Sequence, residues 1–107
     1  MQVSRLEAMT KGWFVGDFTP VVHRTSAAEV AVKRYLRGDR EERHVHRIAH
    51  EITVVIEGEV EMNGRRFVAG DIIVLAPNES TDFQALTDAT NVVVKLPSIA
   101  NDKYPVD

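Results

Sequence analysis

The sequence predicts a single all-β domain, an antiparallel sandwich or barrel, and three observations support this. Segments rich in β-branched and aromatic residues recur along the chain. Turn signals separate them at intervals of about 8 to 12 residues. The chain has 107 residues, of which 44% are hydrophobic, so one domain can bury a core. No repeat, low-complexity tract or linker divides it, and we treat residues 1–107 as one domain.

The expected strands follow one another from residue 30 onward. Asn63-Gly64 is the strongest hairpin signal, because both residues tolerate the positive φ that a two-residue turn requires. Gly38-Asp39 and Gly70-Asp71 indicate two further turns, and Pro77-Asn78 ends a strand. We therefore expect strands over residues 30–36, 51–56, 60–62, 65–68, 72–75, 83–86 and 91–96.

The two ends of the chain carry weaker signals. Ser4 to Met9 is the only segment that suggests a helix, and it would be short; alternatively, it is part of an arm. Exposed strand edges favour pairing between subunits, so we expect a homodimer in which residues 1–29 form the arm and edge strands. Residues 97–107 form a tail that should be loosely held unless it docks on a partner subunit.

Charge and composition exclude several classes of function. Thirteen Lys and Arg against sixteen Asp and Glu give a net charge of -3, which argues against nucleic-acid binding and against a basic membrane-surface patch. The chain has no cysteine, so disulfides, thiolate ligands and cysteine nucleophiles are excluded. No signal-peptide or membrane-spanning pattern is visible, and we expect a cytoplasmic protein.

The stretch HVHRIAHE, residues 44–51, holds three of the four histidines and a glutamate. On a strand, His44 and His46 share a face, whereas Glu51 has the opposite parity unless a bend between Arg47 and His50 reverses it. Two imidazoles and a carboxylate suit Fe(II), Mn, Ni, Zn or Cu. The flanking charged residues are equally compatible with an exposed loop, so the residues alone leave both interpretations open.

A family resemblance favours the first interpretation. The spacing of Gly38, His44-x-His46, Glu51 and Gly58 is similar to the first motif of the cupin superfamily, whose RmlC-like members are small. Residues 70–82 resemble the second motif, with one extra residue before its proline and a glutamate in place of its glycine. Across residues 30–96 the resemblance implies an antiparallel cupin β-barrel, also called a double-stranded β-helix or jelly roll, with a metal inside.

The resemblance also implies which residues hold the metal. Carried over residue by residue, the ligands are His44, His46 and Glu51, with Asp82 in the place of the third histidine. Such a nitrogen and oxygen set favours Fe, Mn, Ni or Zn over Cu(I). His50 is an alternative ligand or a general base, and Gln84, which shares the face of Asp82, is a candidate contact for a bound molecule.

Three functions remain open at this level. The first is a metal-dependent enzyme of oxygenase or isomerase type that acts on a small polar molecule. The second is a metal-free, sugar-modifying isomerase or epimerase in which His44 or His46 is the base and Asp82 orients it. The third is a non-catalytic module that binds a small ligand. Arg34, Tyr35 and Arg43 are candidate contacts for an anionic substrate.

Overall fold

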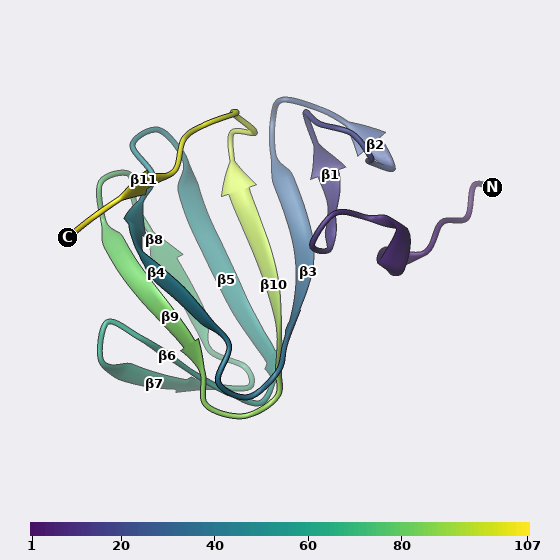
Figure 1. The fold of residues 1–107 in the computed structure, drawn as a ribbon. Helices are drawn as coiled ribbons and strands as arrows, with labels where there is room; N and C mark the ends of the chain where they lie inside the picture. The colour runs from purple at the N-terminus through teal and green to yellow at the C-terminus, as the bar shows by residue number, and fades with distance from the viewer.

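Eleven strands form two sheets that face each other in the computed structural model, which describes residues 1–107 (Figure 1). The six-stranded sheet contains, in spatial order, β2 (His23–Arg24), β1 (Trp13–Gly16), β3 (Glu29–Tyr35), β10 (Ala89–Leu96), β5 (His50–Glu57) and β8 (Ile72–Leu75). The five-stranded sheet contains β11 (Tyr104–Pro105), β4 (Arg40–Val45), β9 (Ser80–Ala85), β6 (Glu59–Met62) and β7 (Arg65–Val68).

The architecture is an open jelly roll. All strand pairs are antiparallel except β1 with β2. No strand pairing joins the two sheets, so they form a sandwich and not a ring closed by hydrogen bonds. The all-β prediction is confirmed, and each of the seven expected strands is present. Strands β4 and β11 were not expected, and β9 begins at Ser80 and not at residue 83. Strands β1 and β2 lie within residues 1–29, where edge strands were expected without exact bounds.

The N-terminal helix expected over Ser4 to Met9 is reduced to a single 3-10 turn, Leu6–Ala8. So short a segment cannot offset the cost of helix nucleation. The chain then turns sharply at Gly12, whose φ is +82° and where a Cβ would lie 1.9 Å from the Val32 carbonyl oxygen. The first residues project away from the two sheets (Figure 1). No helix is long and apolar enough to cross a membrane.

Two turns show why particular residues are needed. Asn63 and Gly64 have φ values of 51° and 73°, and β6 pairs with β7 directly across them, which confirms the predicted hairpin. Gly58 joins β5 to β6 with a φ of 82°, and a Cβ there would lie 2.1 Å from the Asp88 carbonyl oxygen. Only glycine combines that conformation with so close an approach of two backbones.

The space between the sheets divides into an apolar half and a polar half. On β9 the inward side chain changes from buried Phe83 to Thr81, and on β5 it changes from Val55 to Thr53 and Glu51. The polar ends of these strands surround a cavity. The apolar ends pack together in one hydrophobic core, which consists of Val55, Val60, Met62, Phe83, Ala85 and Ala89.

The C-terminal segment does not hang loosely. Strand β11 pairs with β4 of the same chain, opposite His44 and Val45. Asp102, which lies two residues before β11 begins, is only 6% exposed. The expectation of a loose tail is therefore corrected: the segment docks on its own domain, and it does so beside the histidine cluster.

Candidate functional site

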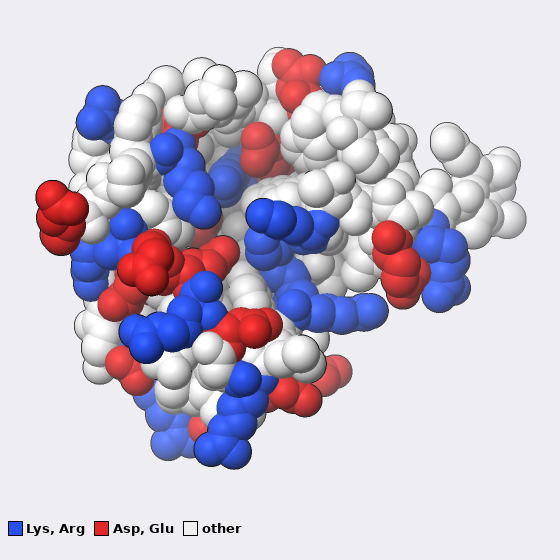
Figure 2. Space-filling model, in the orientation of Figure 1, with Lys and Arg blue, Asp and Glu red and all other residues white.

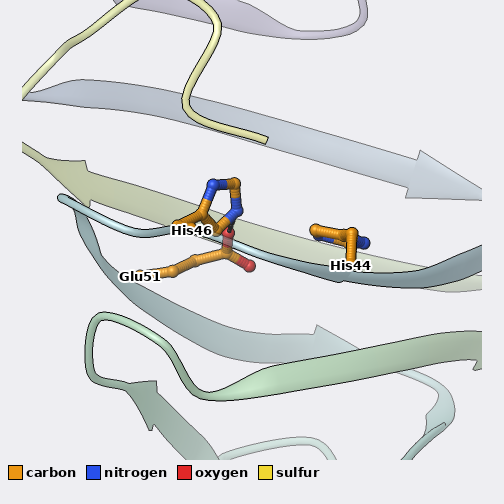
Figure 3. A group of neighbouring side chains, drawn as sticks. All are labelled: His44, His46 and Glu51. Carbon is orange, nitrogen blue, oxygen red and sulfur yellow. Dashed lines mark ion pairs between the residues drawn. The ribbon is translucent and has the colours of Figure 1, made fainter. Parts of the chain in front are cut away.

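The three side chains of the predicted motif meet inside the sandwich. His44 lies on β4, His46 follows it, and Glu51 lies on β5; their candidate donor atoms all lie within 4.8 Å of one another (Figure 3). Both histidines are buried, and their ring centroids are 5.3 Å apart at 80°. A bend at residues 47–48 separates β4 from β5. It reverses the parity, so Glu51 faces inward, as the bend hypothesis required.

Backbone carbonyls fix the orientation of both imidazoles. Nδ1 of His44 lies 2.9 Å from the Glu42 carbonyl oxygen, and Nδ1 of His46 lies 2.5 Å from the Asp102 carbonyl oxygen. A carbonyl oxygen only accepts, so each Nδ1 must donate its hydrogen. When neutral, each ring therefore presents its Nε2 lone pair, and this is the tautomer control that histidine ligands to metals commonly show.

His46 and Glu51 form a close pair that lacks a directed hydrogen bond. His46 Nε2 lies 2.8 Å from Glu51 Oε2, yet this buried nitrogen has no hydrogen bond of acceptable direction. The neighbouring carboxylate raises the pKa of His46, although burial opposes this. Burial raises the pKa of Glu51, but His46 and nearby cations outweigh it, and the pKa stays below its ordinary value.

The donor set fits a divalent metal ion. It offers two neutral nitrogens and a carboxylate, and the buried, unpartnered Nε2 of His46 would gain a partner. Ligand atoms at about 2.1 Å from one ion lie at most about 4.2 Å apart. The largest separation in the group is up to 4.8 Å, so small side-chain rotations are needed to close it.

Asp102 contacts the histidine group and the bend beside it, which the sequence did not reveal. Its carboxylate accepts hydrogen bonds from the backbone N–H groups of Arg47 at 2.9 Å, Ile48 at 3.1 Å and Ala49 at 2.9 Å. It thereby holds the bend that turns Glu51 inward, and its own carbonyl orients His46. The ring of Tyr104 lies 3.8 Å from the guanidinium of Arg47 and holds the same segment. These contacts span more than fifty residues, so no local pattern announces them.

The structure places Asp82 and Gln84 away from this group. Side chains of β9 alternate, and the inward positions are the buried Thr81, Phe83 and Ala85. Asp82 instead faces outward, where it accepts the Asn63 backbone N–H at 2.8 Å and lies 3.4 Å from Arg43. Thr81 stands opposite His44 in the position expected for Asp82. Phe83 could have indicated this, because residues two apart on a strand point to the same face, so an inward Phe83 requires an inward residue 81.

The other candidates also lie elsewhere. His50 begins β5 with an exposed side chain, so the structure does not bring it to His44 and His46. Arg34 is exposed and lies 3.8 Å from Glu7. Tyr35 packs on Phe83 with ring centroids 4.5 Å apart, inside the apolar half. Tyr35 also lines a cavity that His44 and Glu51 line, whereas Arg34 and Arg43 do not.

A cavity of about 440 Å³ opens beside the group. His44 and Glu51 line it, together with inward residues of the six-stranded sheet such as Thr53 and Asn91. Four lysines also line it, and they are functional candidates that the sequence reasoning passed over. Two of them, Lys33 and Lys95, have the inward parity of Ala31 and Val93, which the strand pattern could have shown.

Comparisons with known proteins bear on the fold. No family model and no curated protein matches the chain. A double-stranded β-helix protein from Klebsiella pneumoniae is 27% identical over 72% of this chain and 69% of that chain, with a TM-score of 0.66. An RmlC-like cupin from Desulfovibrio desulfuricans is 25% identical over 73% and 79%, with a TM-score of 0.61.

A third solved structure is an enzyme by its description. A sugar phosphate isomerase of the cupin superfamily from Silicibacter pomeroyi is 26% identical over 68% of this chain and 52% of that chain, with a TM-score of 0.62. These likenesses confirm the fold that the spacing of glycines, histidines and Glu51 indicated.

Proposed function

We propose that this chain, a small cupin domain, binds one divalent transition metal ion through His44, His46 and Glu51 and uses it to act on a small polar molecule. The observation that carries this proposal is the pair of imidazoles whose Nδ1 hydrogens are committed to backbone carbonyls. Both Nε2 lone pairs are then available to a metal ion, in the buried group whose donor atoms lie within 4.8 Å of one another.

The protein donors number three, so coordination positions remain for a substrate. Thr81 stands where a fourth protein ligand was expected, but its hydroxyl donates to the Asp82 carbonyl oxygen at 2.7 Å. Two histidines and one carboxylate with open positions are typical of Fe(II) oxygenases, and related sets hold Mn, Ni or Zn. When bound, the ion would supply Lewis-acid polarisation of a substrate oxygen. The reaction type, oxygenase or isomerase, is the finer part of this proposal.

Two other solved structures of this fold contain metal ions. The bacterial pirin YhhW from Escherichia coli was solved with nickel(II) and is 16% identical to this chain. Oxalate decarboxylase from Bacillus subtilis has Mn(II) centres and is 20% identical. At these identities the likeness shows the fold alone, so the residues of this chain must carry the assignment.

Elemental analysis of protein purified without added metal tests the proposal. We expect about one equivalent of a divalent transition metal in the natural protein and almost none in the variant H44A/H46A. The chain offers a matched control, because its other two histidines are exposed on β2 and at the start of β5. The variant H23A/H50A loses the same number of imidazoles and should retain the metal.

The outcomes separate the predicted ligand sets. Equal metal contents in H44A/H46A and H23A/H50A would contradict the proposal, whether both were high or both near zero. Loss of metal in H23A/H50A alone would assign a ligand role to His50 or His23 that the geometry does not support. Circular dichroism of each variant checks that the strands remain.

One observation favours a second function, metal-free acid–base catalysis. His44 lines the cavity, and its Nδ1 is committed to the Glu42 carbonyl oxygen, so its Nε2 is the nitrogen that would take a proton from a bound molecule. In this alternative His44 is the base, because both ring nitrogens of His46 already face protein oxygens, those of Asp102 and Glu51. Turnover that survives complete removal of metal by a chelator would favour this function over the metal-dependent one; ligand binding without turnover would favour a binding module.

We further propose that the chain forms a homodimer. Strand β8 is an open edge of the six-stranded sheet, and its outward side chains Ile72 and Val74 are 64% and 57% exposed. A second copy would cover these apolar side chains and the edge. Light scattering should give twice the 12.0 kDa chain mass, and I72E should give the monomer mass. V68E, on the edge strand β7 of the other sheet, is the control.

A further inference from the structure

Every lysine of the chain lines the cavity beside the histidine group. The sequence contains four lysines, Lys11, Lys33, Lys95 and Lys103, and all four border this one space. Of the nine arginines, only Arg40 does so. The lining thus carries five cationic side chains against two glutamates, in a chain whose net charge is -3. Figure 2 shows blue side chains gathered around the hollow between the two sheets.

None of these lysines forms a salt bridge within the protein. Each salt bridge of the structure uses an arginine or a histidine, and none uses a lysine. Lys33 is half-buried, and burial lowers the pKa of its ammonium group although Glu41 opposes this. Five cations near two carboxylates leave an excess of positive charge in the cavity, and the partial burial of Lys33 has a free-energy cost that an anion in the cavity would offset.

Trp13 gathers two of these cations. The Nζ atoms of Lys33 and Lys95 lie 5.6 and 5.0 Å from the centroid of its indole ring. The ring comes from β1, whereas the lysines come from β3 and β10, so three adjacent strands bring these groups together. Attraction between ammonium groups and the ring face keeps both amines at this wall of the cavity.

Asn91 gives an independent sign of a ligand. It lies directly across from Lys33 on β10, lines the cavity and is 1% exposed. Its Oδ1 is buried and has no hydrogen-bond partner in the protein. A buried acceptor without a donor is unfavourable, and such groups are usually satisfied by water or by a ligand. The donor that fits is a hydroxyl group on a molecule inside the cavity.

We propose that the cavity binds a small hydroxylated anion, the size of a single sugar acid or sugar phosphate. Lys33 and Lys95 hold its carboxylate or phosphate group, and Asn91 accepts a hydrogen bond from one of its hydroxyls. The volume of about 440 Å³ lies within the range of small-molecule sites. The role of this anion as a substrate rests on the proposed function, because His44 and Glu51 line the same cavity. The binding of the anion is independent of the proposed function.

The single tryptophan reports binding directly, since Trp13 is part of the cavity wall. We propose fluorescence titrations of metal-free protein at constant ionic strength with two matched pairs of probes. D-Gluconate is compared with neutral sorbitol, and D-glucose 6-phosphate is compared with neutral glucose. We expect a saturable change with at least one anion and none with either neutral partner. Whichever anion binds more tightly identifies the carboxylate or the phosphate as the group recognised.

Matched variants locate the site. Lys33→Gln and Lys95→Gln should each weaken anion binding about tenfold or more, since each removes a desolvated partner of the anion. Arg34→Gln is the control, because Arg34 is the next residue on β3 and faces the opposite side of the sheet. It should bind the anion as the natural protein does. Circular dichroism checks the fold of each variant, and the comparison of charged with neutral probes needs no variant at all.

The outcomes distinguish this inference from the metal site. Failure of both anions to bind, or equal binding of a neutral partner, overturns the inference while leaving the metal content untouched. The same holds for equal weakening in Arg34→Gln and Lys33→Gln. Anion binding that persists in H44A/H46A, together with absence of metal from the natural protein, would overturn the proposed function and support the anion site.

Discussion

Replacement of Asp102 by alanine should destabilise the domain and loosen the bend that positions Glu51 beside the two histidines. The carboxylate accepts three backbone N–H groups of the bend between β4 and β5. Arg47 and Ile48 are exposed, so water can replace the carboxylate there, at about 0.5 kcal/mol each. Ala49 is 3% exposed, and its N–H would lose a charged acceptor without compensation, at about 2 to 3 kcal/mol.

We therefore expect Asp102→Ala to lower the free energy of unfolding by about 3 to 4 kcal/mol. For a domain of this size the loss corresponds to a fall in Tm of about 12 °C or more. Urea denaturation followed by circular dichroism measures the free energy, and Asp107→Ala, an exposed aspartate of the same segment, is the control. A loss below about 1 kcal/mol would refute the idea that this carboxylate holds the bend.

The same contact has a consequence for pH. Burial raises the pKa of Asp102, but the three N–H groups outweigh it and hold that pKa below 3.8, its ordinary value. A carboxylate with a lowered pKa stabilises the fold fully above the pKa of the unfolded chain and loses this effect as the pH falls through the folded value. The difference in stability between the natural protein and Asp102→Ala should be constant above about pH 5 and should shrink toward about pH 2.

Two further predictions concern the turn after β5 and the outward face of β9. Gly58→Ala should lower the free energy of unfolding, measured by urea denaturation, more than Gly70→Ala does. Both glycines have positive φ, but only at Gly58 would the new Cβ lie 2.1 Å from a carbonyl oxygen, that of Asp88. We expect about 3 kcal/mol against about 1 kcal/mol, and equal losses would contradict the steric argument. Asp82→Ala should leave the metal content unchanged in elemental analysis, and a clear fall would return Asp82 to the ligand set.

Local sequence was sufficient for much of the fold. Most of the predicted strands contain several β-branched or aromatic residues, and the Asn63-Gly64 turn follows from the φ values that these two residues tolerate. The histidine pair was equally local, because His44 lies near the end of β4, His46 follows one residue after that strand, and the extended backbone gives the two side chains the same face. Glu51 needed a bend, which the sequence allowed but did not require.

Contacts between distant segments could not be read in this way. Asp102 reaches the bend from more than fifty residues away, and nothing near it in the sequence names its partner. The outward position of Asp82 was missed for a different reason: the family motif was followed by counting from Pro77, and the alternation of side chains on β9 was not considered. Thr81 and Phe83 are two residues apart, so an inward Phe83 indicates that Thr81, and not Asp82, points inward. The motif count gave Asp82 instead, because this chain has one extra residue between Gly70 and Pro77.

The division of the interior leads to a last prediction, on the balance between stability and binding. The apolar half contains the core, whereas the polar half contains an unpaired amide oxygen and unpaired lysines. Such groups are unfavourable for folding and are kept where a site needs them. Lys33→Met keeps the bulk of the side chain and removes the half-buried charge. It should therefore raise Tm by a few degrees, which corresponds to about 1 kcal/mol of stability, while weakening the binding of anions reported by Trp13 about tenfold or more, as Lys33→Gln does. A Tm that falls by a similar amount would show that Lys33 stabilises the fold through its contact with Trp13. It would also contradict the idea that the charge of Lys33 is kept for anion binding at the expense of stability.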